Sequence, residues 1–377
     1  MPASPKERAL LSALRSRVER RAKLGSTGRV PVRVGIGDDC AVLRLPPGQE
    51  LLITTDMSLE TIHFRRDWHA PESVGHRCLA RGLSDLAAMG ATPLAAFLSL
   101  ALPPELLAQQ RGRPAWQERF FSGLLALADK CNVVLAGGDT AQSPAYKGIQ
   151  IGNTRTGNFG SKRHGSTGLA LADIVLVGSA PRGRALLRST AQPGDCIYVT
   201  GHLGGAAAEL ALLQKNPKRF ARVCDENANA HDLLAARAVQ HPHLFPQPRL
   251  AVGQALLQRR WATSAIDISD GLSTDLDHLC EESGVCAEIE AVRLPLHPLA
   301  AARPDALHLA LHGGEDYELL FTAAAKNRVP RSIAGVPVAR IGQILPQRKG
   351  SQPRMLILCA DAKRAVPLHA AGWEHYG

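Results

Sequence analysis

Residues 34–64 read VGIGDDCAVLRLPPGQELLITTDMSLETIHF and hold two short apolar runs, each beside acidic residues. The run LLI at residues 51–53 predicts a buried strand, which places Asp56 where that strand emerges. Gly35 and Gly37 let the backbone bend tightly and come close to a ligand. Hard oxygen ligands at strand ends suit Mg²⁺, which also binds water and substrate phosphates. The alternative is a pair of acid-rich turns, and this stretch alone leaves both interpretations open.

The composition indicates a globular protein with an anionic partner. The 377 residues are enough for two domains, and 45% of them are hydrophobic. The net charge of +10 favours anionic partners, but it does not distinguish nucleic acid from a small phosphate ester. Only 4% of the residues are aromatic, and no tight basic run contains interleaved aromatics. Binding of nucleic acid by base stacking is therefore disfavoured, and we expect no nucleic-acid partner.

Cysteine spacing and apolar runs predict a cytoplasmic location. The eight cysteines are scattered, and the closest pair, Cys280 and Cys286, fits no usual zinc spacing. Free thiols in a reducing compartment are the simpler interpretation. Residues 1–25 have the pattern of an amphipathic helix rather than a signal peptide. The apolar run at residues 93–102 is too short to span a bilayer, so we expect no membrane association.

The next part of the chain adds two acidic residues at the ends of predicted elements. Helical spacing from Pro71 to Gly90 predicts a helix with Asp85 near its C-terminal end. A carboxylate there opposes the helix dipole, so we expect a metal or a basic side chain beside it. Residues 94–102 predict a strand and residues 116–130 a helix. Residues 133–135 then form a short strand that runs into AGGDT, in which two glycines precede Asp139 and allow backbone N–H groups to approach phosphate.

The second half of the chain contains two more acidic clusters. Asp267 and Asp270 flank Ser269 at a predicted strand-to-helix junction, in the segment AIDISDGLSTDLDHL. In the following helix, Asp275 and Asp277 are expected to be capping or surface residues. The segment HGGEDYELLFT at residues 312–322 joins two glycines to further acids before a strand resumes. The glycine loop at residues 201–205 resembles a phosphate-binding loop, although glycine loops alone are weak evidence.

Several basic or polar segments allow more than one interpretation. Residues 145–168 contain six glycines and four Lys or Arg, and we interpret them as a mobile, basic insertion. This segment would be either a lid over a nucleotide or a solvated excursion. His241 and His243 are interpreted as loop histidines, with metal binding as the alternative. One of three nearby arginines is expected to reach an anion and two to be solvated: Arg182, Arg184 and Arg188.

Acidic residues at glycine-rich turns recur in five separate segments: Asp39, Asp56, Asp85, Asp139, and Asp267 with Asp270. If these carboxylates converge, they repel one another and raise their pKa values unless cations neutralise them. Several Mg²⁺ ions and a polyphosphate would explain such a cluster. Phosphoryl transfer needs little beyond positioning and neutralisation of charge. No acid-base catalyst is required where the nucleophile is a phosphate oxygen, which is already ionised at neutral pH.

Eight sequence blocks, in family order from residue 34 to residue 322, closely resemble the thiamine-monophosphate kinase family. They are GIGDDCAVL, TTDMSLETIHF, GLSDLAAMGATP, LAGGDT, GRALLRSTAQPGD, YVTGHLGGAAAEL, AIDISDGLSTDLDH and GGEDYELLFT. The resemblance implies an α/β fold of two domains, like that of aminoimidazole ribonucleotide synthetase, in a homodimer joined through N-terminal strands. We expect the domains to comprise residues 1–180 and 181–377.

The same resemblance implies a reaction. It is ATP-dependent phosphorylation of thiamine phosphate to thiamine diphosphate, with Mg²⁺ and ATP, as the last step of thiamine diphosphate biosynthesis. Two alternatives remain. One is another ATP-using member of the superfamily that activates an amide or a selenide, although no cysteine precedes Cys40. The other is a catalytically silent protein that binds Mg²⁺ and nucleotide, which has no need to keep so many acids.

The resemblance also implies the roles of individual residues. Magnesium positions are Asp39, Thr54, Thr55, Asp56, Asp85, Asp139, Asp267 and Asp270. Nucleotide positions are Gly138, Asp139, Arg188 and Ser269. Thiamine-phosphate positions are His63, Glu315 and Trp373. The chain departs from the family pattern at the 145–168 insertion, and at residues 60–62, where the family often has small residues before the histidine.

Overall fold

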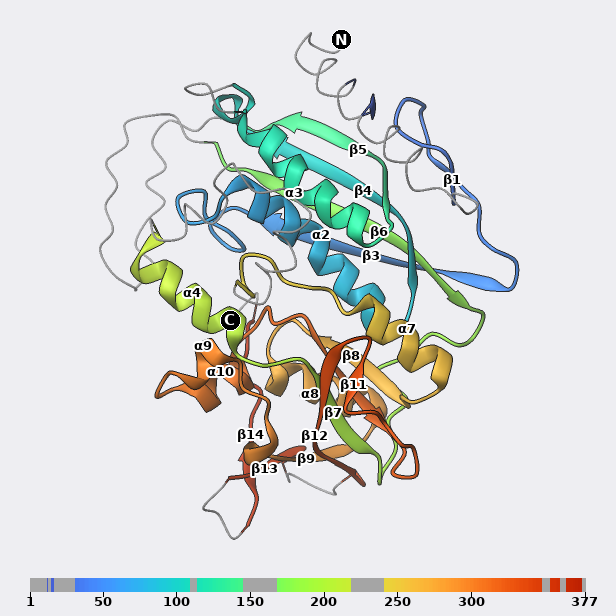
Figure 1. The fold of residues 1–377 in the computed structure, drawn as a ribbon, viewed down its shortest axis with the longest axis vertical. Helices are drawn as coiled ribbons and strands as arrows, with labels where there is room; N and C mark the ends of the chain where they lie inside the picture. The colour runs from blue at the N-terminus through green and yellow to red at the C-terminus, as the bar shows by residue number, and fades with distance from the viewer. Residues whose placement is uncertain are drawn as a thin grey trace.

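The computed structural model describes residues 12, 15–16, 31–108, 114–144, 168–217, 241–347, 353–359 and 364–374. In the N-terminal half, a four-stranded sheet has the order β3-β6-β4-β5 (Figure 1). The strands are β3 (Gln49–Leu59), β4 (Thr92–Leu102), β5 (Val134–Gln142) and β6 (Leu171–Pro181). A ribbon of β1 (Val32–Val34) and β2 (Val42–Leu43) packs apolar side chains against the outer face of this sheet. The 3-10 helix η1 (Pro104–Leu107) follows β4.

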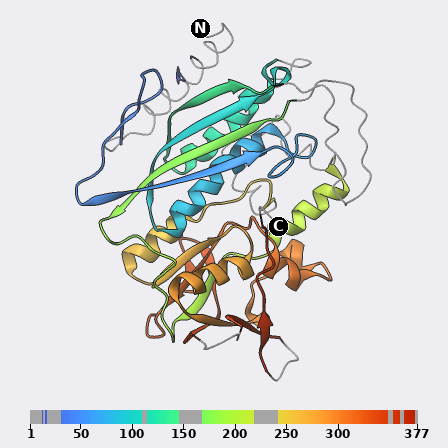
Figure 2. The same cartoon turned by 180° about the vertical axis from the view of Figure 1, so that it is seen from behind.

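Helices α2 (Pro71–Ala88) and α3 (Trp116–Lys130) cover the other face of the four-stranded sheet (Figures 1 and 2). Pro71 occupies the first turn of α2, where its missing N–H costs nothing, and Gly90 ends the helix with a φ of +70°. The two helices approach closely at Gly75 and Gly123. A Cβ at Gly75 would lie 1.9 Å from the carbonyl oxygen of Phe120, so only glycine permits this contact.

The C-terminal half is built on an eight-stranded sheet with the order β14-β13-β9-β12-β7-β10-β8, to which β11 adds by pairing with β12. Its strands are β7 (Cys196–Thr200), β8 (Ser264–Ile268), β9 (Cys286–Glu290), β10 (Glu318–Ala323), β11 (Ser332–Ile333), β12 (Val336–Leu345), β13 (Met355–Leu358) and β14 (Val366–Leu368). Its helices are α4 (Gly205–Lys215), α7 (Leu250–Arg259), α8 (Leu272–Ser283), η2 (Ala291–Arg293), α9 (Pro298–Ala301) and α10 (Ala306–His312).

Helix α2 joins the two halves. One continuous apolar core contains Leu86 of α2, Leu256 of α7 and Phe321 of β10. At Gly253 of α7, a Cβ would lie 1.8 Å from the carbonyl oxygen of Ala87, so α2 and α7 are in direct contact. Because α2 is buried between both halves, its polar side chains can meet residues from either of them.

The structure confirms several predicted elements and corrects others. The strand at 94–102, the helix at 116–130 and the place of Asp85 in the last turn of α2 are confirmed. Residues 51–53 lie in a strand as predicted, but the expectations that all three are buried and that the strand ends before Asp56 were wrong. Strand β3 continues to Leu59, and Leu51 and Ile53 lie on its exposed outer face, because side chains alternate between the two faces of a sheet. Asp139 likewise lies within β5.

Two predicted segments lie outside the described residues: the N-terminal amphipathic helix, apart from residues 12, 15 and 16, and residues 145–167 of the insertion. In the part of the chain that the structure describes, all seven cysteines are free thiols. The described helices include none with the length and apolar character needed to cross a membrane.

Candidate active site

Three carboxylates meet where the two halves adjoin α2: Asp56 in β3, Asp85 in the last turn of α2 and Asp267 in β8. Burial, followed by the charge of Asp85, raises the pKa of Asp56 to about 6. Burial and the charges of Asp85 and Asp56 raise the pKa of Asp267 to about 7. Burial also raises the pKa of Asp85. Each carboxylate thus disfavours ionisation of another, which is the behaviour expected of converging acids.

Polar neighbours offset part of this repulsion. The Thr54 hydroxyl donates a hydrogen bond to Asp85 Oδ2, and the Ser84 hydroxyl donates one to Asp267 Oδ2 at 2.7 Å. Arg81 Nε lies 3.5 Å from Asp56 Oδ1. The positive charge of Arg188 lowers the pKa of Asp85 and Asp267, against the larger effect of burial. The expectation that Asp85 would have a basic neighbour is therefore confirmed.

The junction between β8 and α8 holds Ser269 and Asp270. Asp275, in the first turn of α8, accepts hydrogen bonds from the backbone N–H groups of Ser269, Asp270 and Gly271 at 3.1, 3.2 and 3.1 Å. Burial raises the pKa of Asp275 well above its ordinary value, as do the charges of Asp267 and Asp270. Asp275 thus fixes the loop that carries two predicted site residues, and its expected capping role is confirmed.

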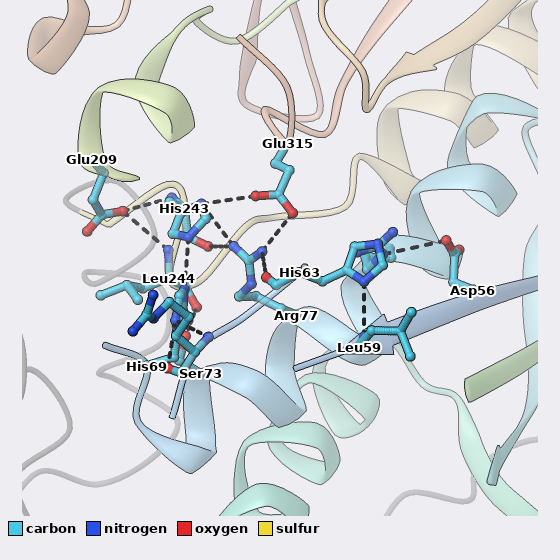
Figure 3. A network of polar contacts seen from close by, with 12 residues as sticks. Asp56, Leu59, His63, His69, Ser73, Arg77, Glu209, His243, Leu244 and Glu315 are labelled. Carbon is cyan, nitrogen blue, oxygen red and sulfur yellow. Dashed lines mark hydrogen bonds and ion pairs between the residues drawn. The ribbon is translucent and has the colours of Figure 1, made fainter. Parts of the chain in front are cut away.

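The residues predicted to bind thiamine phosphate divide into two groups. His63 and Glu315 are joined through Arg77, whose Nη2 donates to the His63 carbonyl oxygen at 3.1 Å and to Glu315 Oε1 at 2.7 Å (Figure 3). The backbone N–H of Glu315 donates to the Ser269 carbonyl oxygen at 2.7 Å. Trp373 lies at the other side of this junction, where its backbone N–H donates to the Asp270 carbonyl oxygen at 3.0 Å. Trp373 is about half exposed to solvent, at 49%.

Asp139 lies across the sheet from the three converging carboxylates. The register pairs Met57 of β3 with Asp173, Asp173 with Ser99, and Ser99 with Asp139. Three steps between adjacent strands separate Asp139 from β3 by about 14 Å. Directly opposed residues share a face, so Asp139 lies on the outer face together with Asp173 and the exposed Met57. One Mg²⁺ ion therefore cannot bind both Asp56 and Asp139 within this chain.

The remaining predicted positions lie near the outer face. The Thr55 hydroxyl donates to Asp173 Oδ1 at 3.0 Å. Asp39 is in an exposed turn, and the preceding Gly35 lies against Ala136 at the start of β5. Gly138 has a φ of +149°, and a Cβ there would lie 1.9 Å from the Leu98 carbonyl oxygen. Close packing against β4 therefore already explains why glycine occupies position 138, independently of any contact with a nucleotide.

The donors around the three carboxylates suit a hard cation. Within the described residues, no three Asp, Glu, His or Cys side chains form a preassembled metal cluster. Mg²⁺ usually keeps several waters and binds one or two carboxylates together with substrate phosphates. Carboxylates whose pKa values are raised by burial, and for Asp56 and Asp267 also by neighbouring carboxylates, match that donor set together with the Thr54 hydroxyl.

The glycine loop before α4 is not open to phosphate. The backbone N–H groups of Gly204 and Ala206 donate to the carboxylate of Asp316 at 2.6 and 3.1 Å. Burial raises the pKa of Asp316 to about 7, against these hydrogen bonds. The resemblance of residues 201–205 to a phosphate-binding loop was therefore misleading, because an acid more than 100 residues later satisfies the loop donors.

Sequence reasoning missed the basic residues of α2. Arg77, Arg81 and Asp85 are spaced four residues apart and so share one face of the helix, which is a signal that could have been read. It also treated His243 as a loop histidine, whereas the structure buries this residue against Glu315 and Arg77. That contact has no local sequence signal, because its partners are far away in the chain.

Comparison with known proteins supports the same architecture. Residues 37–158 match the family described as AIR synthase related protein, N-terminal domain. Residues 192–366 match AIR synthase related protein, C-terminal domain. The fold and the site between its two halves define the chain as an AIR synthase related protein.

Relatives of known name narrow this class. The thiamine-monophosphate kinase of Escherichia coli (strain K12) is 38% identical over 357 residues, which cover 93% of this chain and 94% of the relative. The crystal structure of thiamine-monophosphate kinase from Stenotrophomonas maltophilia K279a is similar, with a TM-score of 0.70 and 33% identity, and the match covers 92% of this chain and 96% of that one. A structure described as AaThiL complexed with AMPPCP and TMP has a TM-score of 0.64 and 26% identity, with 95% of each chain covered. The chain belongs to the thiamine-monophosphate kinase family, as its sequence blocks predicted.

Proposed function

We propose that this protein transfers the γ-phosphoryl group of ATP to thiamine phosphate, which yields thiamine diphosphate and ADP. Family membership supports the choice of substrates, since one relative of known structure is described as a complex with AMPPCP and TMP. The observation that carries the proposal is the meeting of Asp56, Asp85 and Asp267, which come from both halves of the molecule. Their raised pKa values indicate a site that is completed by cations.

Mg²⁺ is the cation that we propose for this site. Asp56, Asp85, Asp267 and the Thr54 hydroxyl would hold it near the α2 junction, and Asp139 would hold a separate ion on the outer face. When bound, Mg²⁺ would neutralise the phosphate oxygens of ATP. Arg188, whose charge lowers the pKa of Asp85 and Asp267, would contact the nucleotide phosphates. Ser269 and Gly138 are further nucleotide contacts in this proposal, with Asp39, Thr55 and Asp270 as further metal positions.

The transfer is proposed to be direct and in line. The acceptor is a phosphate oxygen that is already anionic at neutral pH, so no side chain needs to remove a proton from it. The chain's own residues would position the two phosphates and exclude water. No phosphoenzyme is formed, and incubation with γ-labelled ATP in the absence of acceptor should leave the protein unlabelled.

The test of the function is incubation of the full chain with ATP, Mg²⁺ and thiamine phosphate, followed by separation of the products by chromatography. We expect equal amounts of thiamine diphosphate and ADP. ADP with inorganic phosphate and no thiamine diphosphate would point to another ATP-using member of the superfamily. No turnover of ATP under these conditions would favour a protein that only binds nucleotide.

We also propose that the chain acts as a homodimer, in the cytoplasm, with domains at residues 1–180 and 181–377. The outer face of the four-stranded sheet supports the dimer, because it exposes Leu51, Ile53 and Met57 along one side of β3. A second copy of the chain packed on this face would remove these side chains from water.

A further inference from the structure

Arg77 lies in the middle of α2, where segments from four parts of the chain meet (Figure 3). Its side chain is 4% exposed. Besides its bonds to the His63 carbonyl oxygen and Glu315, it donates from Nη1 to the His243 carbonyl oxygen at 2.5 Å. A buried guanidinium with these acceptors is engaged by the protein itself, so it serves to hold neighbouring groups in place.

The proton on His243 can be assigned from its neighbours. Its Nδ1 lies 3.1 Å from Glu315 Oε2 and 3.0 Å from Arg77 Nη1. Although burial opposes it, the charge of Arg77 and the hydrogen bond from His243 hold the pKa of Glu315 well below its ordinary value. Oε2 is therefore an acceptor, and a bare Nδ1 beside it would place two acceptors in contact. We assign the proton to Nδ1, which then donates to the charged Oε2, while Arg77 Nη1 donates to the His243 carbonyl oxygen. In the opposite tautomer Nδ1 would accept from Arg77 Nη1 instead.

The remaining contacts agree with this tautomer. His243 Nε2 is then an acceptor, and His69 Nε2 donates to it across 3.0 Å. His69 Nδ1 lies 3.1 Å from both the backbone nitrogen and the carbonyl oxygen of Arg65, and in this tautomer it accepts from the N–H. Burial lowers the pKa of both His69 and His243, which keeps both rings neutral. The hydrogen bonds thus run in one direction, from the Arg65 backbone to the Glu315 carboxylate.

The backbone of His243 is fixed as firmly as its ring. Glu209 Oε2 accepts the N–H groups of His243 and Leu244 at 2.8 and 3.2 Å. The Ser73 hydroxyl of α2 donates to the Leu244 carbonyl oxygen at 2.8 Å. His243 is therefore held between α4 and α2 and cannot swing towards a ligand without breaking these bonds.

Both carboxylate oxygens of Glu315 are used inside the protein, one by Arg77 and the other by His243. Glu315 also has a φ of +69°, which non-glycine residues rarely adopt, and its N–H is bonded to Ser269. Such a conformation persists where the surroundings fix it, and it marks a loop whose shape matters for function.

We propose that Arg77 and His243 are positioning residues for the acceptor side of the site, and that they act by tying Glu315 and residues 313–318 to α2. The kinetic part of this inference rests on the proposed kinase function. Through the same network, the His63 carbonyl oxygen and the Ser269 carbonyl oxygen are held at fixed places relative to α2.

Two substitutions of His243 test the assignment directly. The side-chain amide of Asn can occupy the place of Nδ1–H, whereas that of Gln reaches the place of Nε2. His243→Asn should keep the donor to Glu315 and lose less than threefold in kcat/KM for thiamine phosphate. His243→Gln should lose about tenfold or more, because it removes a hydrogen bond to a charged group. The KM for ATP should stay within twofold in both variants. Equal losses, or a greater loss for His243→Asn, would overturn the proposal.

A matched control is the ion pair between Glu72 of the same helix and Arg119, whose two bonds measure 2.7 and 2.9 Å. Glu72→Gln breaks a pair of similar geometry that faces α3, so kcat/KM should not change. A loss as large as that of His243→Gln would mean that any weakening of α2 lowers activity, and would overturn the positioning role.

A spectroscopic measurement separates this inference from the proposed function. Nitrogen-15 NMR of the histidine rings in the ligand-free full chain should show His243 as the neutral Nδ1–H tautomer, which is the less common form of imidazole. The same signal should change to Nε2–H in Glu315→Gln, where an amide can turn its N–H towards Nδ1. If the wild-type chain does not phosphorylate thiamine phosphate, the proposed function fails while this measurement still decides the network. An Nε2–H form in the wild-type chain would overturn the inference.

Discussion

Asp267 is a residue whose placement favours ligand binding over stability. It is almost fully buried in β8, and its neighbours include two other carboxylates, Asp85 and Asp56. The Ser84 hydroxyl and the charge of Arg188 offset only part of the cost of ionising it. A cation bound here would neutralise the carboxylates and remove their repulsion. Under the proposed function, the repulsion that destabilises the ligand-free chain would therefore favour binding of metal and phosphate.

This placement predicts an unusual dependence of stability on pH. The pKa of Asp267 is raised from 3.8 to about 7 in the folded chain, so between these values the folded state binds more protons than the unfolded state. Its contribution to the free energy of unfolding therefore falls as pH rises towards 7. Asp267→Asn should be more stable than wild type at pH 8 without metal, by about 2 kcal/mol, and this gain should be smaller at pH 5 and vanish only below about pH 4.

Urea unfolding of both proteins at pH 5 and pH 8, in EDTA, measures this difference. Excess Mg²⁺ at pH 8 should reduce the difference in the free energy of unfolding, because it should stabilise the wild-type chain alone. A variant that is less stable than wild type at both pH values would contradict the account of Asp267 as a repelled carboxylate.

Activity should be sensitive to single carboxylates at this site. Asp56→Asn and Asp139→Asn should each lower kcat about 100-fold or more while the fold is kept, because in the proposed mechanism each removes a charge that would hold Mg²⁺ against phosphate. Circular dichroism would establish folding, and product chromatography would establish turnover. Asp67, an exposed residue paired with Arg65, provides the control, and Asp67→Asn should be fully active. Near wild-type turnover of either test variant would remove that residue from the metal site.

At the scale of elements, local patterns predicted more than distant contacts did. The helix at 116–130 and the junction around Ser269 follow from apolar spacing and from Gly271 before the helix, which are local signals. Strand β3 was cut short because Thr54 and Thr55 were interpreted as the end of a strand, although a half-exposed strand alternates apolar and polar residues over its whole length. The alternation of exposed and buried side chains is present in residues 51–58, but the predicted end of the strand did not take it into account.

The site itself was only partly predictable for a different reason. Sequence motifs identify the candidate site residues, but the distances between those residues depend on which strands lie next to each other in the sheet. Asp56 and Asp139 follow similar motifs, yet the strand order β3-β6-β4-β5 separates them by the width of the sheet. Asp316 fills a glycine loop more than 100 residues before it. Contacts between residues so far apart in the chain depend on tertiary packing and produce no periodic pattern in a single sequence.

The cap of α4 gives a prediction at this scale. Because Asp316 accepts the N–H groups of Gly204 and Ala206, Asp316→Ala leaves two buried donors unsatisfied and should lower the free energy of unfolding by about 1 to 3 kcal/mol. Asp305 is a matched control. It precedes α10, but its side chain makes no capping bond and instead pairs with Arg303 at the surface. Asp305→Ala should change stability much less, and equal losses in urea unfolding would argue against the cap.

At the scale of the whole molecule, α2 determines how the two halves meet. Its apolar side chains share a core with α7 and β10, and its polar face carries Arg77, Arg81 and Asp85 towards the junction. The buried network around Arg77 adds bonds across the same boundary. We infer that the two halves are held in one arrangement near the acceptor side, so the acceptor would enter a site that is already formed.

The outer face of the four-stranded sheet gives the last prediction. Ile53 is 67% exposed on β3, and Leu51 and Met57 lie on the same face of that strand, so a second copy can bury these apolar side chains there. Ile53→Lys would bury an unpaired charge in that interface, which is unfavourable because the charge loses its hydration. The substitution should therefore convert the dimer to a monomer at micromolar concentration. Val292 of η2 is also 67% exposed, and Val292→Lys should leave the assembly unchanged. Sedimentation equilibrium distinguishes the two states, with the wild type expected at twice the mass of the Ile53→Lys chain. A monomeric wild type, or an Ile53→Lys dimer as tight as the wild type, would show that this face is not the interface.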